Sequence, residues 1–191
     1  MSLVQFGKRT HINILHTCAS GAIHNALRKC RTYIVSEYYD GVESGLYVNG
    51  VLSQNLEATS FHENTFDLII TEDILEHIAD PEKACKEIKR ILKPGGRHIS
   101  TISVMWDQPK SLVRSRIQEG KLKHYLPPVY HGDPNRPEDA LVFVDFGADV
   151  VDKYLSLTGS TEVLWSHNNR GDEELFAIYN NMVFVSRKLI G

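Results

Sequence analysis

Acidic side chains stand directly after segments that read as buried strands. Glu37 follows the β-rich residues 32–36, and Glu72 and Asp73 follow the compact apolar run 66–71. In α/β sheets, an acid at the end of a strand can accept hydrogen bonds from both hydroxyls of a ribose. Residue type and place therefore predict a nucleoside ligand at Glu37. A turn acid without a ligand is the alternative.

The turn after the first predicted strand restricts the kind of nucleoside. A dinucleotide-binding turn carries Gly-x-Gly-x-x-Gly, whose backbone cradles the pyrophosphate. Here residues 16–21 read His-Thr-Cys-Ala-Ser-Gly, and Gly21 is their only glycine. The sequence therefore disfavours a dinucleotide and favours either a nucleoside without phosphates or no cofactor.

Histidine and cysteine spacing gives neither a metal nor a disulfide pattern. The nine histidines include no His-x-x-x-His pair and no compact His/Asp/Glu trio at ligand spacing. Cys18, Cys30 and Cys85 are odd in number and are separated by 12 and 55 residues. We therefore expect no metal site and three free thiols.

Strand and helix patterns alternate along the chain. The elements that they predict would position the acidic side chains at the strand ends. Helical spacing or capping predicts helices over residues 21–27, 81–92 and 148–157, and strand patterns cover 11–16, 32–36, 48–52, 66–71, 97–104, 161–166 and 181–188. This order predicts an α/β fold with a doubly wound, mostly parallel, seven-stranded Rossmann-like sheet and an antiparallel edge hairpin. Ligands of such sheets bind at the carboxyl ends of the strands.

Composition sets the class of protein and of partner. The chain has 191 residues, 21 Lys and Arg against 24 Asp and Glu, and a net charge of −3, which suits one domain over residues 1–191. The balanced charge argues against nucleic acid as a partner and favours a small molecule. The longest apolar run, 140–144, is too short for a membrane span, and the polar start is unlike a secretory signal. We therefore expect a cytoplasmic protein.

One set of motifs is specific in combination. Residues 64–78 read NTFDLIITEDILEHI, Asp80-Pro81 follows, and residues 92–96 read LKPGG. This set resembles class I S-adenosylmethionine-dependent methyltransferases. The resemblance implies S-adenosylmethionine as the cofactor and methyl transfer to a small-molecule acceptor through an oxygen or nitrogen nucleophile. A degenerate member of this fold that binds or scaffolds without catalysis is the alternative, because the glycine-rich first motif is reduced.

The resemblance also implies site residues. Glu37 matches the ribose-binding acid, Asn55 and Leu56 match the adenine position, where Asp is usual in place of Asn, and Thr71 and Glu72 flank the methionine part. The full cofactor-binding set is predicted as His16, Thr17, Ala19, Gly21, Glu37, Tyr38, Asn55, Leu56, Thr71 and Glu72.

The acceptor side is predicted in the segment 105–146, which is too long for an ordinary connection and is expected to act as a lid. His131 and Asp133 lie there in a loop bounded by Gly and Pro, as candidates for acceptor binding or proton removal. An Asx-type turn with His131 packed at the surface is the alternative. Asp73 is predicted to contact the cofactor's amino group or the acceptor, which makes His131 and Asp73 the candidate catalytic residues.

Overall fold

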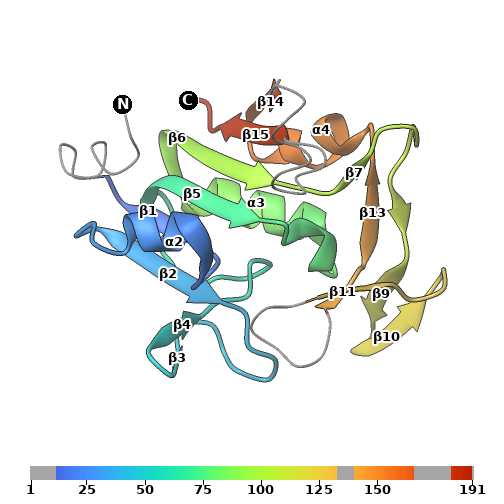
Figure 1. Cartoon of the computed structure of the whole chain (residues 1–191), viewed down its shortest axis with the longest axis horizontal. Coiled ribbons are helices and arrows are strands. Elements are labelled where there is room, and N and C mark those ends of the chain that lie inside the picture. Colours follow the sequence, from blue (N-terminus) through green and yellow to red (C-terminus); the bar gives the residue numbers. More distant parts are fainter. Residues whose placement is uncertain (1–11, 133–139, 166–181, 191) are drawn as a thin grey trace.

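The computed structural model describes residues 12–132, 140–165 and 182–190, and its centre is an eight-stranded sheet (Figure 1). The strands lie in the order β14-β15-β6-β5-β1-β2-β4-β3. Their bounds are β1 Ile14–His16, β2 Tyr33–Glu37, β3 Tyr47–Val48, β4 Val51–Ser53, β5 Phe66–Glu72, β6 Leu92–Thr101, β14 Ser160–Trp165 and β15 Met182–Arg187. The strands β4, β2, β1, β5 and β6 are parallel, whereas β3, β14 and β15 pair antiparallel. The predicted α/β fold with an antiparallel edge hairpin is confirmed.

The sheet is covered on both faces because successive side chains of a strand point to opposite sides. In β5, Leu68 and Ile70 pack with Leu27 of helix α2 (Gly21–Leu27). Ile69, between them, belongs to the core on the other face, together with helix α3 (Pro81–Ile91). The near-continuous apolar run of β5 is thus explained by burial on both faces.

Local signals set the bounds of α3 as predicted. Asp80 caps the helix, since its Oδ1 accepts a hydrogen bond from the backbone N–H of Lys83 at 3.0 Å, and Pro81 occupies the first turn. The side chains that face the core recur at helical spacing and are Ala84, Cys85, Ile88 and Ile91.

The predicted single strand over residues 48–52 is wrong in detail. The chain forms a hairpin there, with β3 and β4 joined by Asn49 and Gly50, whose φ angles are 50° and 83°. Asn-Gly is the preferred sequence of a two-residue hairpin turn because both positions need positive φ. This hairpin adds an eighth strand to the predicted sheet.

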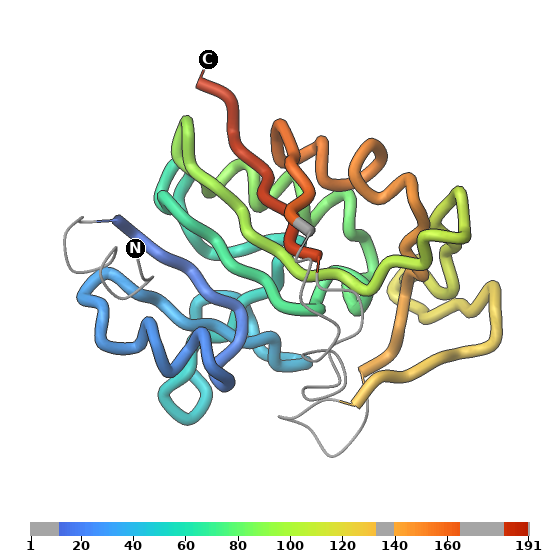
Figure 2. Tube along the Cα trace, turned by 45° about the horizontal axis from the view of Figure 1, so that its top comes forward, coloured from blue at the N-terminus to red at the C-terminus, as the bar shows by residue number. Residues whose placement is uncertain are grey.

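The segment 105–146 is built from short strands (Figure 1). They are β7 Val104–Met105, β8 Leu112–Val113, β9 Ser115–Gln118, β10 Lys121–His124, β11 Tyr130–His131, β12 Ala140–Leu141 and β13 Val144–Gly147. Among them β7, β13 and β8 make a three-stranded sheet, while β9–β10 and β11–β12 are two-stranded. Both views place this segment beyond the carboxyl ends of β5 and β6 (Figures 1 and 2).

The remaining helical pattern is split in two. The predicted helix over 148–157 consists of α4 (Val150–Lys153) and the 3-10 turn η2 (Leu155–Leu157), and a second 3-10 turn, η1 (Leu75–His77), follows β5. In the part of the chain that the structure describes, every helix is too short or too polar to cross a membrane.

Candidate active site

The sheet register places the predicted site acids Glu37 and Glu72 on the two sides of the end of β1. His16, the last residue of β1, pairs with Val35 of β2 and with Ile70 of β5. Both neighbouring strands continue beyond this point, to Glu37 and Glu72. We call the ends of β1, β2, β4 and β5 the carboxyl edge. Strands on the two sides of β1 are connected in opposite directions along the sheet, which is the switch point where α/β sheets bind ligands.

The end of β1 and the loop after it hold both glutamates. The backbone N–H of Ala19 donates to Glu37 Oε1 at 2.7 Å, and His16 Nε2 lies 2.6 Å from Glu72 Oε1. Thr17 is tied to β5, because its hydroxyl donates to the carbonyl of Ile70 at 3.3 Å. Three predicted cofactor residues, His16, Thr17 and Ala19, therefore position the acids and the loop between them.

His16 is fully buried, and both of its ring nitrogens have partners. A carboxylate only accepts, so in the neutral ring Nε2 donates to Glu72 and Nδ1 accepts from the hydroxyl of Tyr33 at 2.8 Å. The Tyr33 oxygen also lies 3.0 Å from His24 Nδ1. Burial raises the pKa of Tyr33, so the phenol stays a donor. No local pattern marks Tyr33 or His24 as partners, since they meet His16 only in the folded chain.

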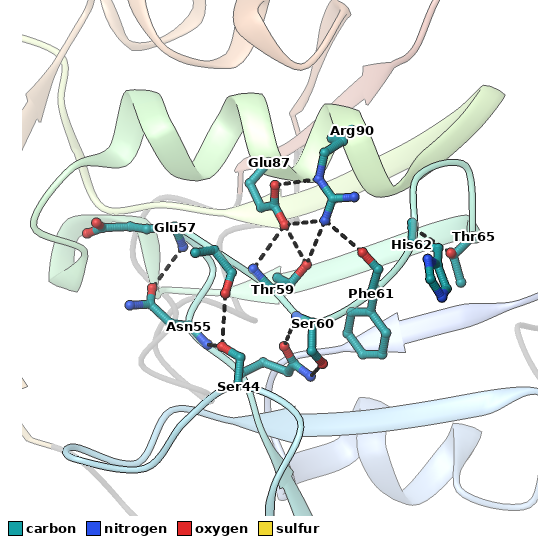
Figure 3. A network of polar contacts seen from close by, with 12 residues as sticks. Ser44, Asn55, Glu57, Thr59, Ser60, Phe61, His62, Thr65, Glu87 and Arg90 are labelled. Carbon is teal, nitrogen blue, oxygen red and sulfur yellow. Dashed lines mark hydrogen bonds and ion pairs between the residues drawn. The ribbon is translucent and has the colours of Figure 1, made fainter.

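The predicted adenine position lies in a tight turn after β4 (Figure 3). Asn55 Oδ1 accepts from the backbone N–H of Glu57 at 2.8 Å, and the Asn55 N–H donates to Ser44 Oγ at 3.0 Å. Ser44 in turn donates to the carbonyl of Ala58 at 2.9 Å. Leu56 is buried, with 6% of its surface exposed. The turn therefore presents Asn55 at the surface and anchors Leu56 in the core.

An ion pair on α3 supports this turn and is another group that sequence reasoning missed (Figure 3). Glu87 Oε1 accepts from the backbone and hydroxyl of Thr59 at 2.9 and 2.6 Å, and from Arg90 Nη2 at 2.6 Å. Arg90 also donates to the carbonyl of Phe61 at 2.7 Å. These hydrogen bonds hold the pKa of Glu87 below its usual value despite burial.

Three further predicted cofactor residues differ in their surroundings. Thr71 is buried, and its hydroxyl lies 3.0 Å from His98 Nε2 on β6. Tyr38 is exposed and its hydroxyl donates to Asp40 at 3.3 Å. Gly21 begins α2 with φ of 81°, a left-handed angle that side chains other than glycine rarely adopt.

Asp73 follows β5 in a strained conformation. Its φ is 48°, and its backbone N–H donates to the hydroxyl of Thr101 at 3.1 Å. Burial is the largest influence on its carboxyl group and raises the pKa, and the neighbouring Glu72 adds to this effect. His77 and His131 act in the opposite direction, so the two predicted catalytic residues, Asp73 and His131, lie within electrostatic reach of each other.

A compact group of donors lies beside Asp73. Ligand atoms of Glu76, His77 and His131 all lie within 4.8 Å of one another. The expectation that histidines and acids form no compact trio is therefore wrong, because it rested on spacing within the sequence. Folding brings β11 onto η1, which places His131 beside residues from a distant part of the chain. Asp133 lies outside the described residues.

Glu76 is the acid of this group and is buried, with 1% of its surface exposed. Neither carboxylate oxygen makes a hydrogen bond within the described part of the chain. The backbone amides of Glu76 and Ser103 are near enough to favour the charged form, but burial outweighs them and raises the pKa to about 7. A surface hollow elsewhere, on the β9–β10 hairpin, is lined by none of these residues but by Gln118, Glu119, Lys121 and Lys123.

Comparison with known sequences finds a family match over less than half of the chain. Residues 17–100 match the family described as a methyltransferase domain. The ubiquinone/menaquinone biosynthesis C-methyltransferase UbiE of Enterobacter sp. (strain 638) is 32% identical over 124 residues, covering 58% of this chain and 49% of that protein. The chain therefore spans about half the length of this curated relative.

Solved structures with a similar fold cover nearly the whole chain. An S-adenosylmethionine-dependent methyltransferase from Mesorhizobium loti has a TM-score of 0.59 at 12% identity, covering 93% of this chain and 91% of that one. The [4+2]-cyclase SpnF has a TM-score of 0.55 at 17% identity, covering 99% and 81%. Identities this low establish the fold alone, and the fold by itself does not decide the reaction. The match over residues 17–100 and the fold over nearly all of the chain confirm the predicted resemblance to class I S-adenosylmethionine-dependent methyltransferases.

Proposed function

We propose that the chain transfers a methyl group from S-adenosylmethionine to a small-molecule acceptor, with the cofactor at the carboxyl edge. The observation that carries this proposal is the register of β1, β2 and β5. It sets Glu37 and Glu72 on the two sides of the loop after β1, each fixed by a hydrogen bond from that strand or loop.

The residues of this edge suit the chemistry of the cofactor. The Glu37 carboxylate has acceptor capacity beyond the Ala19 N–H, because two carboxylate oxygens offer about four lone-pair sites in all. Ribose hydroxyls are suitable donors, and the turn at Asn55 and Leu56 lies on the next strand outward to receive the adenine. When bound, S-adenosylmethionine supplies an electrophilic methyl group on a cationic sulfonium, which acidic neighbours such as Glu72 favour.

The remaining predicted cofactor residues are assigned mainly to positioning. His16 and Thr17 connect β1 to β5, and Thr71 contacts His98. Ala19 and Gly21 shape the loop, whereas exposed Tyr38 is proposed to cover the nucleoside.

The acceptor is assigned to segment 105–146, as an insertion within one methyltransferase-like domain spanning residues 1–191. Asp73 and His131 are proposed to face the acceptor, with an oxygen or nitrogen nucleophile. Methyl transfer needs alignment more than proton removal, because the sulfonium already supplies the leaving group. The relative from Enterobacter is named a C-methyltransferase, which makes a carbon nucleophile the competing acceptor.

Isothermal titration of the full chain with S-adenosylhomocysteine tests the proposal. We expect saturable binding in the micromolar range. An absence of heat at millimolar ligand, with the protein folded by circular dichroism, would favour the alternative of a scaffold that keeps the fold without the cofactor. Adenosine and NAD⁺ serve as comparison ligands, since a nucleoside site without a phosphate cradle disfavours the dinucleotide.

A further inference from the structure

Glu76 presents an unexplained buried acid. The side chain is 1% exposed, and both carboxylate oxygens lack a hydrogen-bond partner among the described residues. A buried acid without partners is costly unless it is neutral, is paired or coordinates a metal. Imidazole nitrogens of His77 and His131 lie within 4.8 Å of a Glu76 carboxylate oxygen, and imidazole and carboxylate together are common ligands of transition metals.

His77 makes a hydrogen bond of the kind that metal-binding histidines make. Its Nδ1 lies 2.9 Å from the carbonyl oxygen of Leu141, and a carbonyl only accepts, so Nδ1 carries the proton. In the neutral ring the other nitrogen, Nε2, then keeps its lone pair. Metal-binding histidines usually donate their second ring nitrogen to a carbonyl or carboxylate in this way, which fixes both tautomer and ring orientation.

The backbone of the same segment brings the third donor. β11 and β12 pair so that His131 stands opposite Ala140, next to the residue that accepts from His77. The backbone N–H of Phe143 donates to the carbonyl of Glu76 at 2.7 Å, which ties this segment to η1. The rings of His77 and His131 meet edge to face with centroids 5.1 Å apart.

We infer that Glu76, His77 and His131 form a binding site for a divalent first-row transition metal ion such as Zn²⁺ or Mn²⁺. Three protein ligands leave coordination positions open to water or to an acceptor oxygen, as in catalytic rather than structural sites. Donor atoms around such an ion lie about 3.4 Å apart for bonds of about 2.1 Å, so the trio must contract on binding. His131 is exposed on a two-residue strand and is the ligand best able to move.

Charge supports a cation at this place. A second acid, Asp73, lies beside the trio, within electrostatic reach of Glu76. A dication would compensate both acids. The competing account is that Glu76 stays protonated and binds no ion, and the experiment separates the two. The inference does not depend on the proposed methyl transfer, since the ion is bound by this chain alone.

The test uses the full chain, stripped of metal with a chelator and dialysed, then titrated calorimetrically with Zn²⁺ and, in parallel, with Mn²⁺. We expect binding of one ion per chain with micromolar or tighter affinity. His131→Ala and Glu76→Gln should each weaken it by about tenfold or more. His62→Ala, which removes a histidine outside the trio, is the matched control and should bind as the wild type does.

Thermal unfolding provides a second readout. A bound ion should raise the melting temperature of the wild type and of His62→Ala, with little effect on His131→Ala. His131 is exposed, so this variant remains informative even if Glu76→Gln fails to fold. Equal binding by wild type and His131→Ala, or no binding by the folded wild type at 100-fold excess metal, would overturn the site. S-adenosylhomocysteine binding, measured on the same samples, reports separately on the proposed function.

Discussion

At the scale of single residues, the arrangement distinguishes side chains that are proposed to contact the ligand from side chains that hold those in place. Glu37 ends β2 and accepts a hydrogen bond from the backbone N–H of Ala19, whereas His16 is buried and both of its ring nitrogens have partners. The distinction matters because loss of a ligand contact weakens binding in a folded protein, while loss of a buried support also lowers stability.

Glu37→Ala should weaken S-adenosylhomocysteine binding by about 30-fold or more, which corresponds to about 2 kcal/mol, because charge-assisted hydrogen bonds to the ribose are lost. Calorimetric titration measures the change. Glu162→Ala removes an acid on the edge strand β14 and should leave the affinity unchanged. A folded Glu37→Ala protein with wild-type affinity would show that the ribose assignment is wrong.

His98 gives the molecule a pH-dependent stability. Complete burial lowers its pKa from 6.5 to about 4 in the folded state. The contribution of His98 to stability is therefore full above pH 6.5 and is lost as the pH falls toward 4. In this range His98 is protonated in the unfolded chain but stays neutral in the folded chain.

His98→Gln should accordingly reduce the pH dependence of unfolding. Between about pH 7 and about pH 5 the wild type should lose about 2 kcal/mol more stability than the variant. Urea denaturation at each pH measures the difference, and groups common to both proteins cancel in the comparison. Parallel pH profiles for the two proteins would contradict the buried neutral histidine.

At the scale of elements, the turn after β4 depends on a helix on the face of the sheet. Glu87 of α3 accepts two hydrogen bonds from Thr59, in the segment that follows Asn55 and Leu56 (Figure 3). The helix thereby fixes a loop proposed to receive the adenine, although neither Glu87 nor Arg90 is a predicted ligand.

Glu87→Ala should lower the free energy of unfolding by about 2 kcal/mol, because the Thr59 donors and Arg90 lose a partly buried acceptor. Cofactor affinity should also fall, though by less than in Glu37→Ala, since only the order of the turn is affected. Urea denaturation measures the change in the free energy of unfolding, and calorimetric titration measures the change in cofactor affinity. Lys86→Ala, an exposed change on the same helix, should alter neither quantity.

At the scale of the whole molecule, the two proposed halves of the site come from different layers of the fold. The carboxyl edge belongs to the central sheet, whereas His131 belongs to segment 105–146, which lies beyond the ends of β5 and β6 (Figures 1 and 2). Substitutions in one half should therefore act on one reactant.

His131→Ala should reduce turnover by at least about tenfold while changing S-adenosylhomocysteine affinity less than about twofold. The measurement is methyl transfer with any acceptor found by screening, alongside calorimetric titration of the same sample. If the variant lost cofactor affinity as strongly as Glu37→Ala does, the assignment of His131 to the acceptor side would fail.

The sequence alone determined those features that local physics controls. Burial on both faces makes β5 a continuous apolar run, and capping by Asp80 with helical spacing defines α3. The alternation of strands and helices then predicts the sheet and its ligand-binding edge, so the strand-end acids Glu37 and Glu72 are identifiable from residue order alone. The missed β3–β4 hairpin also carries a local signal, the Asn-Gly turn.

Only the tertiary structure decided which distant side chains meet. His131 joins Glu76 and His77 because Leu141 and Phe143 of segment 105–146 hydrogen-bond to η1, and nothing in the spacing of residues 76 and 131 encodes that contact. The Tyr33 hydroxyl between His16 and His24 likewise depends on strand register. Periodicity reports which face of an element is buried, but partners across elements depend on how complete strands and loops pack against one another.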